Sequence, residues 1–274
     1  MEHRSFDHTL AAQVNPRLWV VSHIWDCQEP WDQLIMSETE IAMTTSAARE
    51  AAEDEVLAKL RIALAEFTAD TFRQVGDELH VIGHIVGPDR VNGNSPSGHG
   101  SDEIVAVSLL LRIGGELTRA IADLFANGRQ YAAAALLRQM VEIEYLAWAF
   151  ETRDKDAERW LRSTREERES FFKPCKLRQA SNGKFRGKDY GYHCELGGHP
   201  VPGSYILLKG DVALGQLLLS DLLGHTGRIW DHVLDWAAGN SWAVPIIVRR
   251  REEMWQRYTE WKQADTLTRL PPPP

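Results

Sequence analysis

Residues 129–152 read RQYAAAALLRQMVEIEYLAWAFET, a run of strong helix formers that is apolar on nearly every side. Placed at 100° steps, one stripe of the helix carries the apolar residues Leu136, Met140, Ile143, Ala147 and Phe150. Alanine, valine and leucine side chains occupy much of the remaining circumference. Because a helix that is apolar nearly all round is buried, this segment predicts the central helix of a helical bundle.

Two charged side chains interrupt this apolar helix. Arg138 and Glu142 lie one turn apart, and Tyr145 continues their stripe opposite the Leu136 to Phe150 face. Charged groups on a buried helix need partners, because burial without a partner is costly. Two interpretations stay open: a structural ion pair between Arg138 and Glu142, or an interior polar site that both residues face.

Hydrophobic periodicity predicts several further helices around this one. A capping box at Ser37 to Glu40 begins a long helix that ends near Val75. Later helices are expected from Asp102 to the Asn127-Gly128 pair, over residues 211–238, and from Pro245 onward. Two stretches look β-like, around residues 80–86 and 205–208. The fold class predicted is all-α, a multi-helix bundle with a long N-terminal helix.

Two irregular regions divide the chain. Residues 86–101 are rich in Gly, Pro, Ser and Asn, and residues 173–203 are rich in Gly and Pro. We therefore predict an N-terminal segment over residues 1–100, a helical bundle over 101–264, and a proline-rich tail over 265–274. Long loops within a domain are often functional, so 173–203 is a candidate site region.

Composition limits the classes of function. The 274 residues carry a net charge of −8 with a pI near 5.7, which argues against coating nucleic acid through overall charge. No apolar run is long enough to predict a membrane span or a signal peptide, and three widely spaced cysteines fit a reducing compartment. A cytoplasmic protein without a membrane partner is expected. No cofactor is expected, because the Gly-Gly pairs lack nucleotide-binding spacing.

The region 173–203 concentrates positive charge before Asp189. Its six cations suit contact with phosphate oxygens, although an ordinary solvated charge run remains the alternative. They are Lys173, Lys176, Arg178, Lys184, Arg186 and Lys188. We take Lys184, Arg186, Lys188 and the nearby Tyr192 as candidate ligand-binding residues for RNA or another phosphate-bearing ligand.

A group of potential metal ligands follows the cations. His193, Cys194, His199 and the more distant Cys175 match no standard zinc spacing, so the sequence predicts no stoichiometric zinc. His225 and His232 lie two turns apart on the helix over 211–238. We interpret His225 as a core histidine that bonds locally to Asp221, and assign neither histidine to a site.

The order of these motifs resembles a group of poorly characterised bacterial helical proteins related to the HEPN superfamily. The likeness rests on residues 133–142, AAALLRQMVE, and on Tyr192 through His199-Pro200, and it spans roughly residues 102–261. HEPN ribonucleases use an arginine followed by a histidine, which the resemblance would place at His199 or His193. It implies a HEPN-like bundle and a role in stress or defence.

These observations combine into one expected site and two alternatives. The expected site is polar, lies in the interior, is built from Arg138, Glu142 and His199, and binds a nucleic acid or phosphate-bearing ligand. The first alternative is a metal-independent endoribonuclease with His193 or His199 as general base, and with Arg186 or Arg138 stabilising the phosphorane charge. The second is a structural module, for example one that forms a homo-oligomer.

Overall fold

A computed structural model describes residues 55–87, 100–153 and 155–269. The long helices are α2 (Glu55–Gly83), α3 (Asp102–Ala126), α4 (Gln130–Thr152), α10 (Val212–Ala238) and α11 (Val244–Ala264). The short helices are α5 (Asp156–Arg162), α6 (Arg165–Glu167), α7 (Pro174–Ala180), α8 (Gly187–His193) and α9 (Tyr205–Leu208). π-Helical turns occupy Arg168–Phe172 and Cys194–Gly198, and 3-10 turns occupy Pro202–Ser204 and Thr266–Arg269. The all-α prediction is confirmed.

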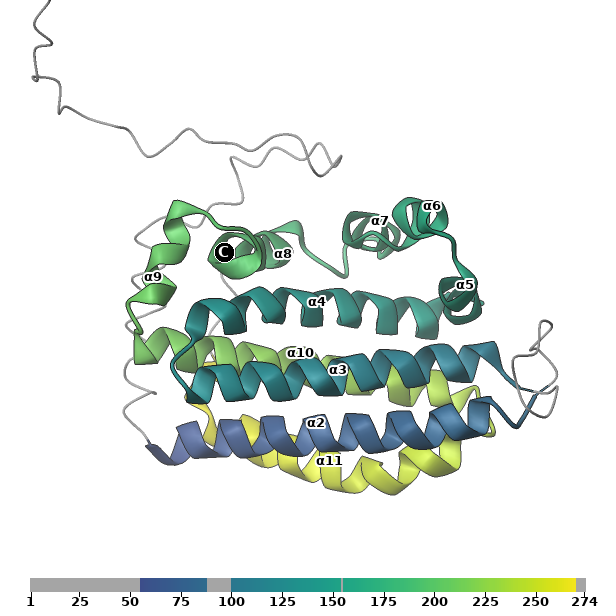
Figure 1. The fold of residues 1–274 in the computed structure, drawn as a ribbon. Coiled ribbons are helices and arrows are strands. Elements are labelled where there is room, and N and C mark those ends of the chain that lie inside the picture. Colours follow the sequence, from purple (N-terminus) through teal and green to yellow (C-terminus); the bar gives the residue numbers. More distant parts are fainter. Residues whose placement is uncertain (1–54, 88–99, 154, 270–274) are drawn as a thin grey trace, which may run out of the picture. The chain divides into compact units, whose positions relative to one another are not determined.

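Helix α4 lies between α3 and α10 on one side and short helices on the other. Figure 1 shows α3 beside α2 and α4, α10 behind them, and α11 under α2, with the short helices α5 to α8 on the other side of α4. Residues Leu137, Met140 and Ala149 of α4 are completely buried, as expected for a central helix. Helix α3 ends at the Asn127-Gly128 pair as predicted, and Gly128 in the turn before α4 has the positive φ of 69° that favours glycine.

The two stretches predicted to be β-like are helical or turn, which makes that expectation wrong. His80 lies within α2, which continues past Val75 to Gly83 because Phe72, Val75 and Leu79 extend one buried stripe. Residues 205–208 form α9. The capping box at Ser37 lies outside the described residues.

The region 173–203 is largely helical, so its description as an irregular loop was wrong. Its glycines and prolines delimit short helices: Pro174 begins α7, Gly183 has a positive φ of 91° in the turn before α8, and Pro202 begins a 3-10 turn. The Gly197-Gly198 pair serves close packing against α4. A Cβ on Gly197 would lie 2.7 Å from the backbone carbon of Ala134.

The packed body also differs from the predicted domain limits. Helix α2, assigned to the N-terminal segment, packs along α3. Asp265 and Leu267, assigned to the tail, are buried, and Asp265 pairs with Arg61 of α2. Within the described ranges, α2, the helices from α3 to α11 and residues 265–267 therefore share one core. None of the described helices combines the length and the apolarity that crossing a bilayer requires.

Replacing Gly197 by alanine is expected to destabilise the protein by about 1–3 kcal/mol, because the added methyl group would press on α4 backbone that cannot move alone. Gly203→Ala is the matched control, since its Cβ would meet no atom within 4 Å. Urea unfolding of the two variants measures the difference. Equal stability of both variants and the wild type would show that the π-helical turn has room to shift.

Candidate metal centre

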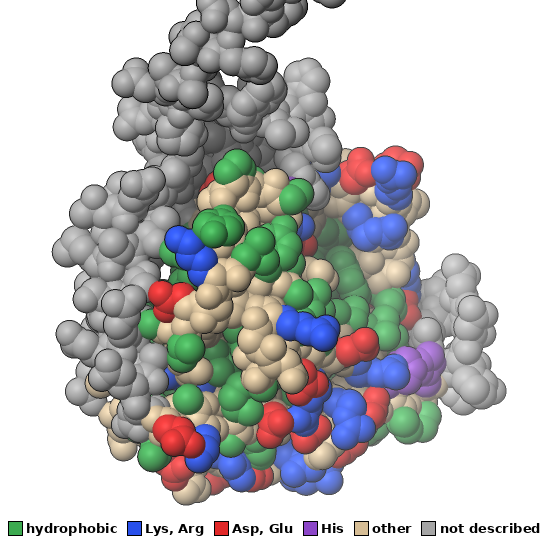
Figure 2. Space-filling model, turned by 60° about the vertical axis from the view of Figure 1, so that its left-hand side comes forward, with side chains coloured by type: hydrophobic (Ala, Val, Ile, Leu, Met, Phe, Trp, Pro, Cys, Tyr) green, Lys and Arg blue, Asp and Glu red, His purple; other side chains and the backbone are tan. Residues whose placement is uncertain are grey.

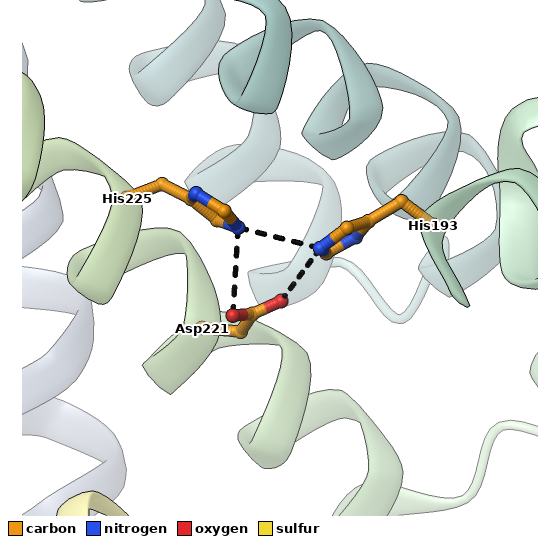
Figure 3. A group of neighbouring side chains, drawn as sticks. All are labelled: His193, Asp221 and His225. Carbon is orange, nitrogen blue, oxygen red and sulfur yellow. Dashed lines mark hydrogen bonds and ion pairs between the residues drawn. The ribbon is translucent and has the colours of Figure 1, made fainter. Parts of the chain in front are cut away.

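Three metal-ligating side chains converge between α8 and α10. His193 is the last residue of α8, and Asp221 and His225 lie one turn apart on α10 (Figure 3). The Nε2 atoms of the two histidines are 3.3 Å apart. Asp221 Oδ2 lies 3.3 Å from His193 Nε2, and Asp221 Oδ1 lies 3.6 Å from His225 Nε2. One carboxylate and two imidazole nitrogens therefore face a common point.

Local packing explains why His193 reaches α10. On either side of it along α8, Tyr190 donates a hydrogen bond to Glu142 of α4 at 3.0 Å, and the buried Cys194 thiol faces the Arg138 guanidinium. These contacts hold one side of α8 on α4. The His193 ring then points to α10, where the spacing of four residues places Asp221 and His225 on one face.

Both histidine rings are buried, and burial sets the charge of His193. Burial is the largest influence on His193 and lowers its pKa to about 4, although the Asp221 carboxylate acts in the opposite direction. His193 is therefore neutral at neutral pH and can offer a nitrogen lone pair to a metal ion. The Asp221 side chain remains one-third exposed, so the group can be approached from that side.

A buried carboxylate on α4 fixes the tautomer of His225. His225 Nδ1 lies 2.6 Å from Glu144 Oε2, and Arg228 Nε donates to Glu144 Oε1 at 2.8 Å. Burial alone would raise the pKa of Glu144, but His225 and Arg228 together hold it at about 2. Because an ionised carboxylate only accepts, Nδ1 carries the proton and Nε2 presents its lone pair to the centre. Arg228 Nη2 lies 2.8 Å from the same Nδ1. With Nδ1 protonated, both of these atoms are donors, so this contact is not a hydrogen bond and the Glu144 carboxylate accepts from both residues.

One oxygen at the centre lacks a hydrogen bond. Asp221 Oδ2 is buried and accepts none, because the nearby His193 Nε2 is not in bonding geometry. An unsatisfied buried carboxylate oxygen is costly, and a cation is one way to offset that cost. Ligands held about 2.0–2.1 Å from a tetrahedral ion lie about 3.3–3.5 Å from one another. The observed separations of 3.3, 3.3 and 3.6 Å therefore suit Zn²⁺ without a large rearrangement.

The interior site expected from the sequence is only partly assembled. Arg138 Nη2 lies 3.2 Å from Glu142 Oε1, so the pair exists, and Tyr190 joins it. The hydrogen bonds of His199 are made by its backbone: its N–H donates to the Cys194 carbonyl, and its carbonyl accepts from the Val201 N–H and the Ser204 hydroxyl. None of them links the His199 ring to this pair. Within the described residues, Arg138 and Glu142 form a partly exposed ion pair on the α8 side of α4.

The predicted ligand-binding residues lie in the segment between α7 and α8 and on α8 itself. Lys184 and Arg186 are exposed, the Lys188 side chain lies outside the described residues, and Tyr192 is partly buried with its ring 5.3 Å from the His193 ring. On the face shown in Figure 2, Lys and Arg side chains are interspersed with Asp and Glu, chiefly along the lower part. Binding of RNA or another phosphate-bearing ligand stays a prediction.

The residues that complete this centre were not predicted from the sequence. His193 was a candidate, but Asp221, His225, Glu144 and Arg228 were not, because His225 lies 32 residues from His193 and 81 from Glu144. The one available signal was the spacing of Asp221 and His225, which places a carboxylate and an imidazole on one helix face. That spacing also fits a local core hydrogen bond, which is how it was interpreted.

Comparison with known proteins adds no family to this description, and the HEPN resemblance stays a prediction. No family model, curated protein or solved structure matches the chain.

Proposed function

We propose that the protein is a zinc-dependent hydrolytic enzyme whose ion is held by His193, Asp221 and His225. The observation that supports this proposal best is the convergence of two imidazole nitrogens and a carboxylate, one oxygen of which is buried without a hydrogen bond. The proposal replaces the expectation of no zinc. That expectation considered only ligands within residues 175–199, where the spacing is not standard.

The number of ligands favours catalysis over a structural role. Structural zinc sites are closed by four protein ligands, whereas catalytic sites use three and leave a position for water or substrate. Among the described residues, the group contains three side chains that can each offer one ligand atom to a metal ion. A zinc ion there would supply a bound water with a pKa near 7, and hence a nucleophile at neutral pH.

The surrounding residues have defined tasks in this proposal. Glu144 keeps the His225 proton on Nδ1, and the His193 proton, which can bond to His225 Nε2 in the free protein, moves to Nδ1 when an ion binds. Burial and the Asp221 carboxylate raise the pKa of Tyr192, so its phenol stays protonated at neutral pH. A protonated phenol can donate a hydrogen bond, and that is the role this proposal gives to Tyr192.

The same geometry disfavours a metal-independent ribonuclease that uses His193, one of its two candidate bases. His193 is 4% exposed and turned toward α10. Arg186, at the N-terminus of α8, precedes His193 by almost two helical turns. A base in this position would have to reach RNA from within the bundle.

Metal analysis of protein purified without a tag tests the proposal, and about one zinc per chain is expected. Removal of the ion with a chelator should abolish hydrolysis of ester, amide or phosphoester reporter substrates, and added Zn²⁺ should restore it. If the chelator-treated protein does not bind Zn²⁺, the proposal is wrong and the three residues form a polar cluster without a metal. A zinc-loaded protein that hydrolyses none of the reporters would contradict the hydrolytic assignment.

A further inference from the structure

We infer that Glu144, held by Arg228, is a positioning residue of the metal site and sets the affinity of His225 for the ion. The inference rests on the proposed zinc site and extends it to α4, which contributes none of the three ligands. In this role Glu144 keeps the Nε2 lone pair of His225 available to bind the ion. A carboxylate that only neutralised a buried histidine would not have this effect.

The contacts place Glu144 directly behind the ligand. Its Oε2 lies 2.6 Å from His225 Nδ1, on the far side of the ring from the Nε2 atom that faces His193 and Asp221. Its side chain is only 4% exposed, so water does not replace this hydrogen bond. Metal-bound histidines usually donate their second ring N–H to such an oxygen, which fixes the ring and raises the basicity of the ligand.

Arg228 holds Glu144 in turn. Its Nε donates to Glu144 Oε1 at 2.8 Å, so each carboxylate oxygen has its own donor and the group cannot rotate without losing both bonds. Arg228 and His225 lie three residues apart on α10, and α10 therefore approaches the Glu144 carboxylate from two sides. This arrangement orients the His225 ring more strictly than packing alone.

A second histidine–glutamate pair, with the same kind of hydrogen bond, lies outside the metal centre. Seven residues further along both helices, His232 Nδ1 lies 2.5 Å from Glu151 Oε2, and the His232 side chain is likewise buried. Among the described residues, His232 does not belong to a metal-ligating group. A purely structural role for His–Glu pairs would make the Glu144 and Glu151 pairs equivalent, whereas a positioning role applies to Glu144 alone.

The experiment compares Glu144→Gln with Glu151→Gln in the full-length protein. Co²⁺ is titrated into each chelator-treated variant and followed by its visible absorption, Zn²⁺ affinity is measured by competition, and thermal unfolding of the metal-free forms is recorded. Glu144→Gln should weaken binding of both ions by about 10- to 100-fold and change the Co²⁺ spectrum. Only one of the two amide atoms accepts, so either Arg228 Nε or His225 Nδ1 loses its acceptor. Glu151→Gln should bind both ions like the wild type.

Each remaining outcome counts against the inference. If Glu144→Gln binds the ions with wild-type affinity, the inference is wrong, although the zinc site itself stands. Equal losses of affinity in Glu144→Gln and Glu151→Gln would also overturn the inference, because they would indicate a general loosening of the α4–α10 interface. A wild type that binds neither ion overturns the inference together with the proposed function. If Glu144→Gln does not fold, Arg228→Gln is tested in its place, because a half-exposed side chain is replaced with less effect on folding. Unchanged affinity of Arg228→Gln for the ions would overturn the inference.

Discussion

Asp221→Ala is expected to lower the affinity for Zn²⁺ by more than 100-fold. The carboxylate is the one anionic ligand of the proposed site, and its loss should exceed the roughly 10- to 100-fold effect of removing a supporting group. The metal-free variant should be as stable as the wild type or more stable, because the substitution removes a buried oxygen that has no hydrogen bond. Calorimetric titration with Zn²⁺ and thermal unfolding with and without Zn²⁺ measure both effects.

Asp235→Ala is the matched control for Asp221→Ala. Asp235 lies on the same helix, is exposed, and does not belong to the ligand group. Its variant should keep the wild-type affinity and the wild-type gain in melting temperature when zinc binds. If Asp221→Ala binds Zn²⁺ as tightly as Asp235→Ala, the carboxylate is not a ligand.

Loss of the buried ion pair between Arg61 and Asp265 should have the largest effect on stability. Both side chains are fully buried, and Arg61 donates two hydrogen bonds of 2.7 Å to the carboxylate. Trp261 Nε1 and the Leu267 amide donate to the same carboxylate. Asp265→Ala leaves a buried guanidinium without its counter-ion, so it should cost about 3–5 kcal/mol in urea unfolding at neutral pH.

The same pair predicts how stability depends on pH. Burial would raise the pKa of Asp265, but the hydrogen bonds and charge of Arg61 outweigh it and hold the pKa below its ordinary value. A carboxylate with a depressed folded-state pKa stabilises the protein above its unfolded-state pKa of about 3.9, and this contribution is lost as pH falls through the folded-state value. Wild-type stability should therefore fall more steeply than that of Asp265→Asn below about pH 4.

Two further variants separate pairing from packing. The double replacement Arg61→Met with Asp265→Leu should recover most of the stability lost in Asp265→Ala, because no charge is left unpaired. Glu78→Ala breaks an exposed ion pair with Arg249 and should cost less than about 1 kcal/mol. A cost for Asp265→Ala as small as that for Glu78→Ala would show that the buried pair contributes little.

Periodicity predicted the long helices well, because the apolar stripes of α3, α4, α10 and α11 extend over several turns. It failed for residues 173–203, where the glycines and prolines that suggested a loop instead begin, end or closely pack short helices. A single position such as Gly197 does not distinguish a loop from a close helix contact. The difference depends on Ala134, which lies far away in the sequence.

The site could not be predicted for a related reason. Hydrophobic periodicity shows that His225 lies on a buried face, and that part of the interpretation agrees with the structure. It does not show which helix covers that face. The partners of His225 are Glu144 on α4 and His193 on α8, as well as Asp221 on its own helix. Only tertiary packing brings these four side chains together.

X-ray absorption at the zinc K edge of the zinc-loaded wild type tests the central claim most directly. The proposed site predicts about four nitrogen or oxygen ligands near 2.0–2.1 Å, with the outer-shell scattering of two imidazoles. Asp221→Ala and His225→Ala should each lose this signature. A sulfur ligand at about 2.3 Å would assign the ion to a cysteine instead, and a shell of oxygens without imidazole would place it on the surface. Either result would contradict a zinc ion between His193, Asp221 and His225.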